Sequence, residues 1–231
     1  MRLLAWNIRA GGGRRLPRIG DALARHAADV IVLSEFRNGE AGTRLREMLG
    51  TLGYGCMTEL GPPPASNGVL IGARLRFRER AMAGAELPEP HRMLAIDVDG
   101  LQLFGVYMPN LKAKIPYWRA LIAALAAERE RPAVAIGDFN TCRAYVDELG
   151  AIDPCAHFMD EVEAVGFCDL WRRRYPEGRE YSWYSTRGNG FRIDHAFLSA
   201  SLTARAGPVR YSHAEREAGL SDHSVLILDL E

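Results

Sequence analysis

The chain has 231 residues, of which 48% are apolar and 25% are charged, which is the composition of a globular protein with a substantial core. Lysine plus arginine and aspartate plus glutamate both number 29, so the formal net charge is zero, which argues against a protein that coats nucleic acid by charge alone. No apolar run reaches the length of a membrane span and the N-terminus has no signal-peptide pattern, so we expect a monomeric, cytoplasmic protein without a membrane partner.

Short apolar runs alternate with amphipathic segments along the chain, which predicts strands interspersed with helices. The predicted strands are Leu3–Ile8, Val30–Ser34, Gly68–Ala73, Met93–Val98, Leu101–Tyr107, Ala133–Gly137, Tyr181–Tyr184, Arg192–Leu198, Val209–Ser212 and Ser224–Leu230. The predicted helices are Pro17–Ala28, Gly42–Leu52, Pro116–Glu130 and His157–Val165. This mixture favours two mixed sheets packed face to face with helices outside, in one domain over residues 1–231.

The arginines and cysteines carry weaker signals. Arginines cluster at residues 172–174, which favours a local nucleic-acid contact, although an arginine-rich composition can also reflect a GC-rich genome. The four cysteines form no C-x-x-C pair and are expected as free thiols.

Polar residues stand where the predicted strands meet loops. They occur in W-N-I-R, L-S-E-F, V-Y-M-P-N, G-D-F-N, R-I-D-H and L-S-D-H, and they are Asn7, Glu35, Tyr107, Asn110, Asp138, Asn140, Asp194, Asp222 and His223. Each has an ordinary structural explanation, such as a turn or a bulge. Glu35 is the hardest to explain in this way, since an acid directly after V-I-V-L-S is costly to bury without a partner. We expect these groups to meet at one rim of the sheets.

This ordered set resembles the endonuclease/exonuclease/phosphatase superfamily, from Asn7 to His223, and is most similar to exonuclease III-type AP endonucleases. The resemblance implies a four-layer α/β/β/α sandwich, an α/β (α+β) fold, with the active site at one rim. It also implies hydrolysis of a phosphoester with Mg²⁺ or Mn²⁺.

The chemistry of each side chain suggests its role in such a site. Glu35 and Asn7 offer the oxygen ligands that these hard cations prefer, and Asp222 completes the site or holds a second ion. Tyr107, Asn110 and His223 are donors for the charge that develops on the phosphate. Asp138 is the candidate to orient or deprotonate the attacking water, and Asn140 would fix the geometry of Asp138. Asp194 would hold His223 in one tautomer and favour its charged form.

The substrate is less well defined by the sequence. In the resembled AP endonucleases an apolar pocket accepts a base-free sugar, and Trp183, Phe191 and Ile193 match its positions, although these side chains can also belong to the core. The chain lacks the asparagine-rich segment that those enzymes have after G-D-F-N, has a short loop at Ser185–Gly190, and has Arg37 where lysine is common.

Three functions therefore remain open at this stage. The leading interpretation is a metal-dependent nuclease that acts on DNA, at abasic sites or 3′ ends. The first alternative is a phosphatase or phosphodiesterase that acts on a small or lipid-derived phosphoester; a lipid substrate would require a long exposed apolar loop, which the sequence does not reveal. The second is a catalytically inactive nucleic-acid-binding module, which predicts loss of a site residue, whereas every expected one is present.

Overall fold

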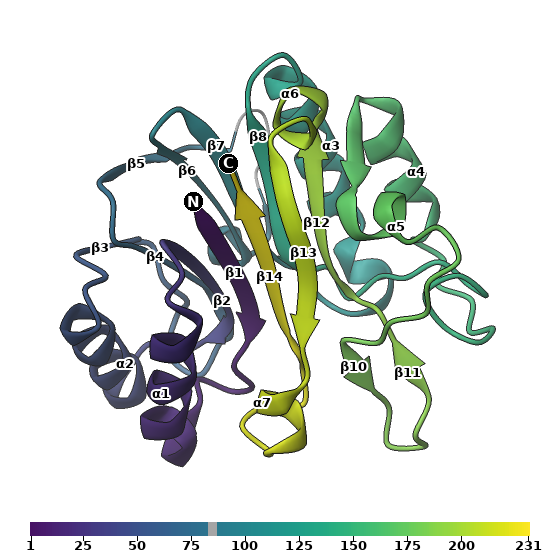
Figure 1. Ribbon diagram of the computed structural model, residues 1–231. Helices are drawn as coiled ribbons and strands as arrows, with labels where there is room; N and C mark the ends of the chain where they lie inside the picture. Colours follow the sequence, from purple (N-terminus) through teal and green to yellow (C-terminus); the bar gives the residue numbers. More distant parts are fainter. Residues whose placement is uncertain (83–86) are drawn as a thin grey trace.

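Two six-stranded mixed sheets form the centre of the molecule in the computed structural model, which describes residues 1–82 and 87–231 (Figure 1). The first sheet has the order β13-β14-β1-β2-β4-β3, with β1 (Arg2–Asn7), β2 (Val30–Phe36), β3 (Cys56–Met57), β4 (Gly68–Ala73), β13 (Ala206–Ser212) and β14 (Val225–Leu230). The second has the order β5-β6-β7-β8-β12-β9, with β5 (Phe77–Arg80), β6 (Met93–Val98), β7 (Leu101–Tyr107), β8 (Ala133–Asp138), β9 (Phe167–Asp169) and β12 (Asp194–Ser199). A separate hairpin joins β10 (Trp183–Tyr184) to β11 (Gly190–Phe191).

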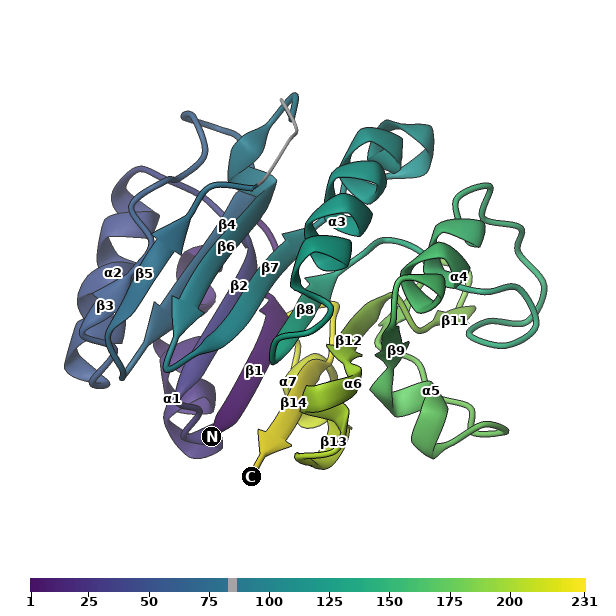
Figure 2. The same ribbon diagram turned by 90° about the horizontal axis from the view of Figure 1, so that it is seen from above.

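Helices cover the outer face of each sheet (Figures 1 and 2). Helices α1 (Leu16–His26) and α2 (Glu40–Thr51) pack on the first sheet, and α3 (Ile115–Glu128) and α4 (His157–Ala164) pack on the second. The shorter helices are α5 (Leu170–Arg174), α6 (Ala200–Thr203) and α7 (Ala214–Glu217), with 3₁₀ turns at Gly13–Arg15, Pro90–Arg92 and Leu111–Lys114. The expected α/β/β/α sandwich is therefore confirmed.

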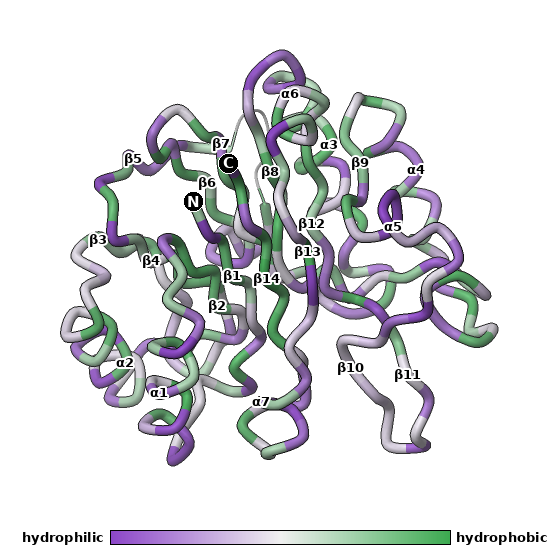
Figure 3. The backbone as a smooth tube through the Cα atoms, in the orientation of Figure 1, coloured by the Kyte–Doolittle hydropathy of each residue, from purple (hydrophilic) through white to green (hydrophobic). Residues whose placement is uncertain are grey.

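Side chains alternate in direction along the strands, and this alternation divides the apolar core into three layers. On β1, Leu3 and Ala5 belong to the cluster between the sheets, whereas Leu4 and Trp6 face the cluster beneath α1 and α2. Successive side chains of a strand point to opposite faces, so a strand between two apolar layers must be apolar throughout. The hydropathy colouring shows such strands in green at the centre of the molecule (Figure 3).

All the predicted strands and long helices are present among the described residues; the boundaries of Gly68–Ala73, Met93–Val98 and Leu101–Tyr107 are as predicted, and those of the others are shifted. The predicted Asp99-Gly100 turn joins β6 to β7, and both of its residues have positive φ, as a tight hairpin turn requires. Strands β3, β5, β9 and β11 were not predicted, because segments of two to four residues show no readable periodicity. No helix among residues 1–82 and 87–231 is long and apolar enough to cross a membrane.

One rim of the two sheets collects the strand ends that matter for function. Strands β1, β2, β7 and β8 end there, and β12 and β14 begin there, at the lower edge in Figure 1. Antiparallel pairing of β12 with β8 places Asp194 opposite Asp138, and parallel pairing of β7 with β8 places Tyr107 beside Asp138. The topology therefore brings together residues that are far apart in the sequence.

A buried ion-pair network stands just outside this rim. The fully buried guanidinium of Arg192 donates to Asp147 Oδ1 and to Asp169 Oδ2, both at 2.6 Å, and lies 3.0 Å from His195 Nδ1. Burial alone would raise the pKa of Asp169, but Arg192 and His195 hold that pKa well below its usual range. Arg192 thereby ties the loop that carries Asp147 to the second sheet. The strand was predicted to begin at Arg192, but β12 begins at Asp194, because the Arg192 amide donates a hydrogen bond to the Asp147 carbonyl of this loop.

Replacement of Arg192 by alanine should destabilise the fold by about 3–5 kcal/mol, because it leaves Asp169 buried without its guanidinium partner and Asp147 paired with Arg172 alone. Urea unfolding followed by circular dichroism measures the change. The matched control is Arg173→Ala on α5, an exposed arginine for which we expect a change within about 0.5 kcal/mol. Equal stability of the two variants would show that the network does not hold this part of the fold.

Candidate active site

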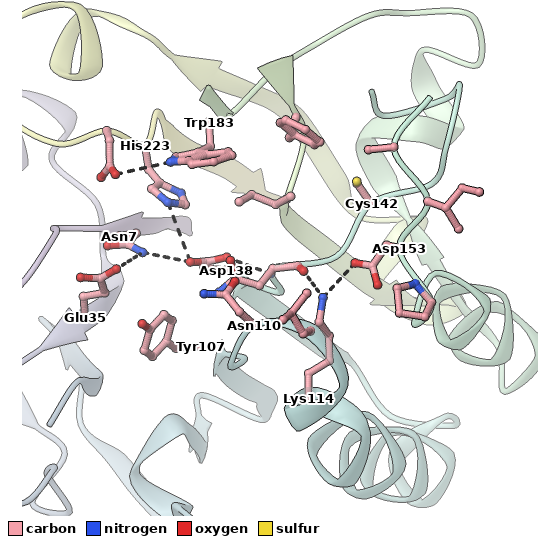
Figure 4. Close-up of a pocket in the computed structure, with 18 residues that line it drawn as sticks. Asn7, Glu35, Tyr107, Asn110, Lys114, Asp138, Cys142, Asp153, Trp183 and His223 are labelled. Atoms are coloured by element: carbon pink, nitrogen blue, oxygen red, sulfur yellow. Dashed lines mark hydrogen bonds and ion pairs between the residues drawn. The ribbon is translucent and has the colours of Figure 1, made fainter. Parts of the chain in front are cut away.

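A pocket of about 430 Å³ opens at the rim and gathers the predicted site residues (Figure 4). Those that line it are Asn7, Glu35, Tyr107, Asn110, Asp138, Asn140, Trp183, Phe191, Ile193, Asp222 and His223. The remaining predicted residue, Asp194, lies buried behind His223. The volume is within the range of small-molecule and cofactor sites.

Glu35 reaches the pocket through a β-bulge at the end of β2. The pairing of β2 with β4 shifts register between Ser34 and Phe36, and Glu35, the extra residue, has a φ of 57°. A bulge redirects a side chain, and a positive φ in a residue other than glycine costs of the order of 1–3 kcal/mol. The Glu35 carboxylate accepts hydrogen bonds from Asn7 Nδ2 at 3.2 Å and from the Ala10 amide at 2.7 Å. The bulge therefore fixes a strained but well-held carboxylate beside Asn7.

Asp138 is positioned by the glycine before it and the asparagine after it. Gly137 has a φ of 146°, and a Cβ atom there would lie 2.1 Å from the Val106 carbonyl oxygen, so only glycine fits. Asp138 Oδ1 accepts the Asn140 amide at 2.9 Å, and Oδ2 accepts Asn7 Nδ2 at 2.9 Å. Burial raises the pKa of Asp138, and the charge of His223 opposes this rise. Asp138 is thus a fixed, buried carboxyl group that faces the pocket.

His223 lies between two carboxyl groups. Its Nδ1 is 2.9 Å from Asp194 Oδ2, and its Nε2, on the pocket side, is 4.0 Å from Asp138 Oδ2. Burial disfavours the charged imidazole, but Asp194 and Asp138 outweigh burial and raise the pKa of His223 to about 9. The imidazole is therefore held as a proton-bearing donor at neutral pH.

Tyr107 and Asn110 occupy the side of the pocket that follows β7. Asn67 donates from Nδ2 to the Tyr107 hydroxyl oxygen at 3.4 Å, and its own Oδ1 accepts Arg37 Nε at 2.6 Å. Arg37 thus orients the Asn67 amide, and this leaves the hydroxyl proton of Tyr107 free to point into the pocket. Burial, with a smaller contribution from Glu35, raises the pKa of Tyr107, which keeps that proton in place. The sequence did not indicate Asn67, although it directly precedes the predicted strand Gly68–Ala73, because its contact with Tyr107 joins residues 40 positions apart.

The opposite side of the pocket is apolar. Trp183 pairs with Phe191 across the β10–β11 hairpin, with ring centroids 5.6 Å apart, and Ile193 follows directly. Trp183 Nε1 lies 3.4 Å from Asp222 Oδ2, so the indole also borders the acidic rim. The predicted trio therefore lies together in the pocket beside the catalytic rim.

The donor set fits a divalent cation such as Mg²⁺ or Mn²⁺. Glu35, Asp222 and the amide oxygen of Asn7 are oxygen donors, which suit hard cations. The three titratable groups that lie within 4.8 Å of one another, Asp138, Asp194 and His223, offer a second possible group of ligands. We favour the Glu35 side, because His223 Nδ1 already contacts Asp194 and His223 is held in its charged form. Carboxylates outnumber cations at this rim, so an anionic substrate requires a cation beside it.

Several residues of the pocket were missed by sequence reasoning. Lys114 lines the wall near α3, where it contacts the Asn140 carbonyl and pairs with Asp153 at 2.8 Å (Figure 4). Cys142 also lines the pocket, and burial raises the pKa of its thiol to about 12, so it remains protonated. Leu111 and Ile152 complete this wall. The sequence did not indicate Lys114, because its partner Asp153 lies 39 residues away along the chain.

The arginines at residues 172–174 lie outside the pocket lining. Arg172 donates to the carbonyl oxygens of Tyr175, Pro176 and Gly178, and Arg174 donates to the Ala206 and Gly207 carbonyls. These arginines lie on α5 and satisfy the backbone of neighbouring segments. A nucleic-acid contact by this cluster stays a prediction, and Arg173, which is exposed, is the arginine most available for it.

Comparison with known protein families gives one clear match. The model of the Endonuclease/Exonuclease/phosphatase family matches residues 4–223, which is nearly the whole chain. No curated protein matches the chain in sequence.

Solved structures with the same fold superpose over the full length. The 3′ phosphatase NExo from Neisseria, solved with a product DNA hairpin, is 25% identical, with a TM-score of 0.84 over 100% of this chain and 99% of the other. The 3′–5′ exonuclease NExo from Neisseria meningitidis is 26% identical, with a TM-score of 0.84 over 100% of both chains. An AP endonuclease from Archaeoglobus fulgidus is 18% identical, with a TM-score of 0.87 over 100% of this chain and 99% of the other, a likeness of fold.

Proposed function

The chain belongs to the Endonuclease/Exonuclease/phosphatase family, whose members hydrolyse phosphoesters, and on that premise we propose that it is a divalent-metal-dependent DNA nuclease of exonuclease III type. One observation carries this proposal: Asn7, Glu35 and Asp138 are joined by hydrogen bonds at the same pocket wall as the His223–Asp194 pair. Two similar structures are named as a 3′ phosphatase with product DNA and a 3′–5′ exonuclease, which supports DNA as the substrate class.

Glu35, Asn7 and Asp222 would hold the metal ion. A bound Mg²⁺ or Mn²⁺ supplies Lewis acidity, which stabilises negative charge on the phosphate oxygens. Asn7 has a second task that the hydrogen bonds support: its Nδ2 contacts both Glu35 and Asp138, so it keeps the two carboxylates at a fixed separation. The Arg9 amide donates to Asn7 Oδ1 at 2.9 Å and thereby fixes the orientation of the side-chain amide.

Asp138 would accept a proton from the attacking water. Its raised pKa brings its basicity closer to neutral pH, where a general base is most effective. The Asn140 amide donates a hydrogen bond to Asp138 Oδ1, and this fixes the orientation of the whole carboxylate before the substrate binds. His223 and Tyr107 would donate hydrogen bonds to the phosphate oxygens, since both carry protons at neutral pH.

A substrate panel tests the proposal as a whole. It contains duplex DNA with an abasic site, duplexes with 3′-hydroxyl and 3′-phosphate ends, single strands, RNA and a bis-aryl phosphodiester, each with Mg²⁺ or Mn²⁺. We expect hydrolysis of DNA, measured by electrophoresis of end-labelled strands. Turnover of the bis-aryl phosphodiester without cleavage of any DNA would leave the family chemistry standing and reject the nuclease.

The metal requirement should depend on Glu35. Chelation with EDTA should abolish activity, and Mg²⁺ or Mn²⁺ should restore it. Glu35→Gln should raise the metal concentration for half-maximal activity at least about tenfold, because the variant loses a charged oxygen ligand. Glu47→Gln, an exposed glutamate on α2, is the matched control and should leave the metal titration unchanged. Full activity in EDTA would contradict the metal assignment.

The chemical step should depend on Asp138. Asp138→Asn keeps the shape of the side chain but removes the base, and should lower kcat by about 10²–10⁴. Single-turnover kinetics on a DNA substrate separate this step from product release. Asp21→Asn, an exposed position on α1, serves as the control. If Asp138→Asn turned over at the rate of this control, Asp138 would not be the base.

A further inference from the structure

Two exposed apolar side chains border the candidate active site. Leu111 is 75% exposed and Ile152 is 86% exposed, yet both line the pocket that contains Asp138 and His223. We call Leu111 and Ile152 the apolar wall. Leu149, 61% exposed, lies on the same loop as Ile152 but outside the pocket lining. Exposed apolar side chains that gather at a functional pocket mark a contact surface, which single exposed leucines do not. The sequence had given no sign of an exposed apolar loop, so this corrects the initial expectation.

The loop that carries Ile152 is held rigidly. Asp147 pairs with the buried Arg192, and Asp153 pairs with the buried Lys114 at 2.8 Å. Between them, Glu148 Oε2 accepts the amides of Gly150 and Ala151 at 2.6 and 2.5 Å. A loop with such anchors presents its apolar tip in a fixed position, and preorganisation lowers the entropy that binding would otherwise cost.

The pocket is larger than a base-free sugar needs. Its volume of about 430 Å³ is in the range that encloses whole small-molecule ligands. Phe191, Ile193 and Trp183 provide the apolar surface near the catalytic rim, and the apolar wall extends this surface away from the rim. The pocket lining therefore offers apolar side chains for more of a nucleotide than its sugar.

The charges beside the wall are of both signs and mostly paired: Lys112 is exposed next to Leu111, and the buried Lys114 pairs with Asp153 at 2.8 Å. Glu148 and Asp153 belong to the loop, and Asp160 and Glu163 lie on the neighbouring α4, where Arg143 pairs with both. An anionic membrane surface attracts clusters of lysine and arginine, so this surrounding favours a nucleobase over a lipid bilayer as the group that covers the wall.

We propose that the apolar wall binds the base of an unpaired 3′-terminal nucleotide, so that the enzyme removes terminal nucleotides that carry a base. This inference rests on the proposed nuclease function. An unpaired terminal base is already free of its partner, so little energy is needed to unstack it. Apolar contact with the base face is tolerant of base identity, and we therefore expect little preference among the four bases.

The test compares two duplexes that differ only in the 3′-terminal residue, which is an unpaired nucleotide in one and a base-free residue in the other. The scissile phosphodiester is the same in both. We expect Ile152→Ser and Leu111→Ser each to lower kcat/KM about tenfold on the base-bearing end and to leave the base-free end unchanged. Leu149→Ser is the matched control, an exposed apolar residue on the same loop as Ile152 but outside the pocket lining, and should behave as the parent on both substrates.

Several results would overturn the inference. Equal losses on the two ends would mean that the wall positions the strand and not the base. A loss in Leu149→Ser as large as in Ile152→Ser would assign the effect to the loop as a whole. Sedimentation of the parent with phosphatidylserine vesicles, abolished by Ile152→Ser, would assign the wall to a membrane. An enzyme that cleaves no DNA but hydrolyses a bis-aryl phosphodiester would instead reject the underlying nuclease function, which distinguishes the two failures.

Discussion

The candidate site depends on the packing of the two sheets against each other, because its polar residues come from both. Asn7 ends β1 in the first sheet and donates 2.9 Å across to Asp138, which ends β8 in the second. His223, just before β14 in the first sheet, contacts Asp194 at the start of β12 in the second. The Tyr211 hydroxyl of β13 also donates a hydrogen bond from the first sheet to the second, to the Asp194 carbonyl at 2.6 Å. The apolar layer between the sheets thus sets the separation at which these groups meet, and a shift of one sheet would separate every pair at once.

This arrangement divides the pocket into two chemically distinct sides. The β2 bulge and the loop before β14 bring Glu35 and Asp222 to an acidic side, whereas the β10–β11 hairpin and the loop at residues 143–154 form an apolar side. An anionic phosphate cannot bind to carboxylates alone, so the acidic side is useful only with a cation. The apolar side can hold a sugar or a base, and the two charged residues that line it, Lys114 and Asp153, pair with each other at 2.8 Å. A phosphodiester of a nucleotide has both kinds of surface, and its two parts match the two sides of the pocket.

Sequence reasoning predicted which residues share the rim, because their positions at strand ends are local features, and it missed the contacts that depend on long-range pairing. Asn7, Glu35, Asp138 and His223 stand directly at the ends of apolar strands, and strand ends in mixed sheets share a rim, so their proximity could be predicted. Lys114 lies in a 3₁₀ turn, and its role depends on Asp153, which no local pattern connects to it. The backbone contacts of Arg172 and Arg174 could not be predicted for the same reason: whether an arginine contacts a backbone carbonyl is decided by tertiary structure.

The anchoring of the loop at residues 143–154 limits how substrate preference could change in this fold. Surface loops usually vary more freely in sequence than the scaffold that carries them. Here Asp147 binds Arg192, and Arg192 lies in sequence between Phe191 and Ile193, two residues of the apolar side. Asp169 and His195 share the same guanidinium, which connects the loop to β9 and β12 as well. A substitution that altered the loop through Asp147 would leave Arg192 without one of its two carboxylates and would disturb the backbone beside Asp194. The apolar wall and the catalytic rim are therefore coupled through one buried arginine, so new specificity is more accessible through exposed tips such as Ile152 than through the loop's anchors.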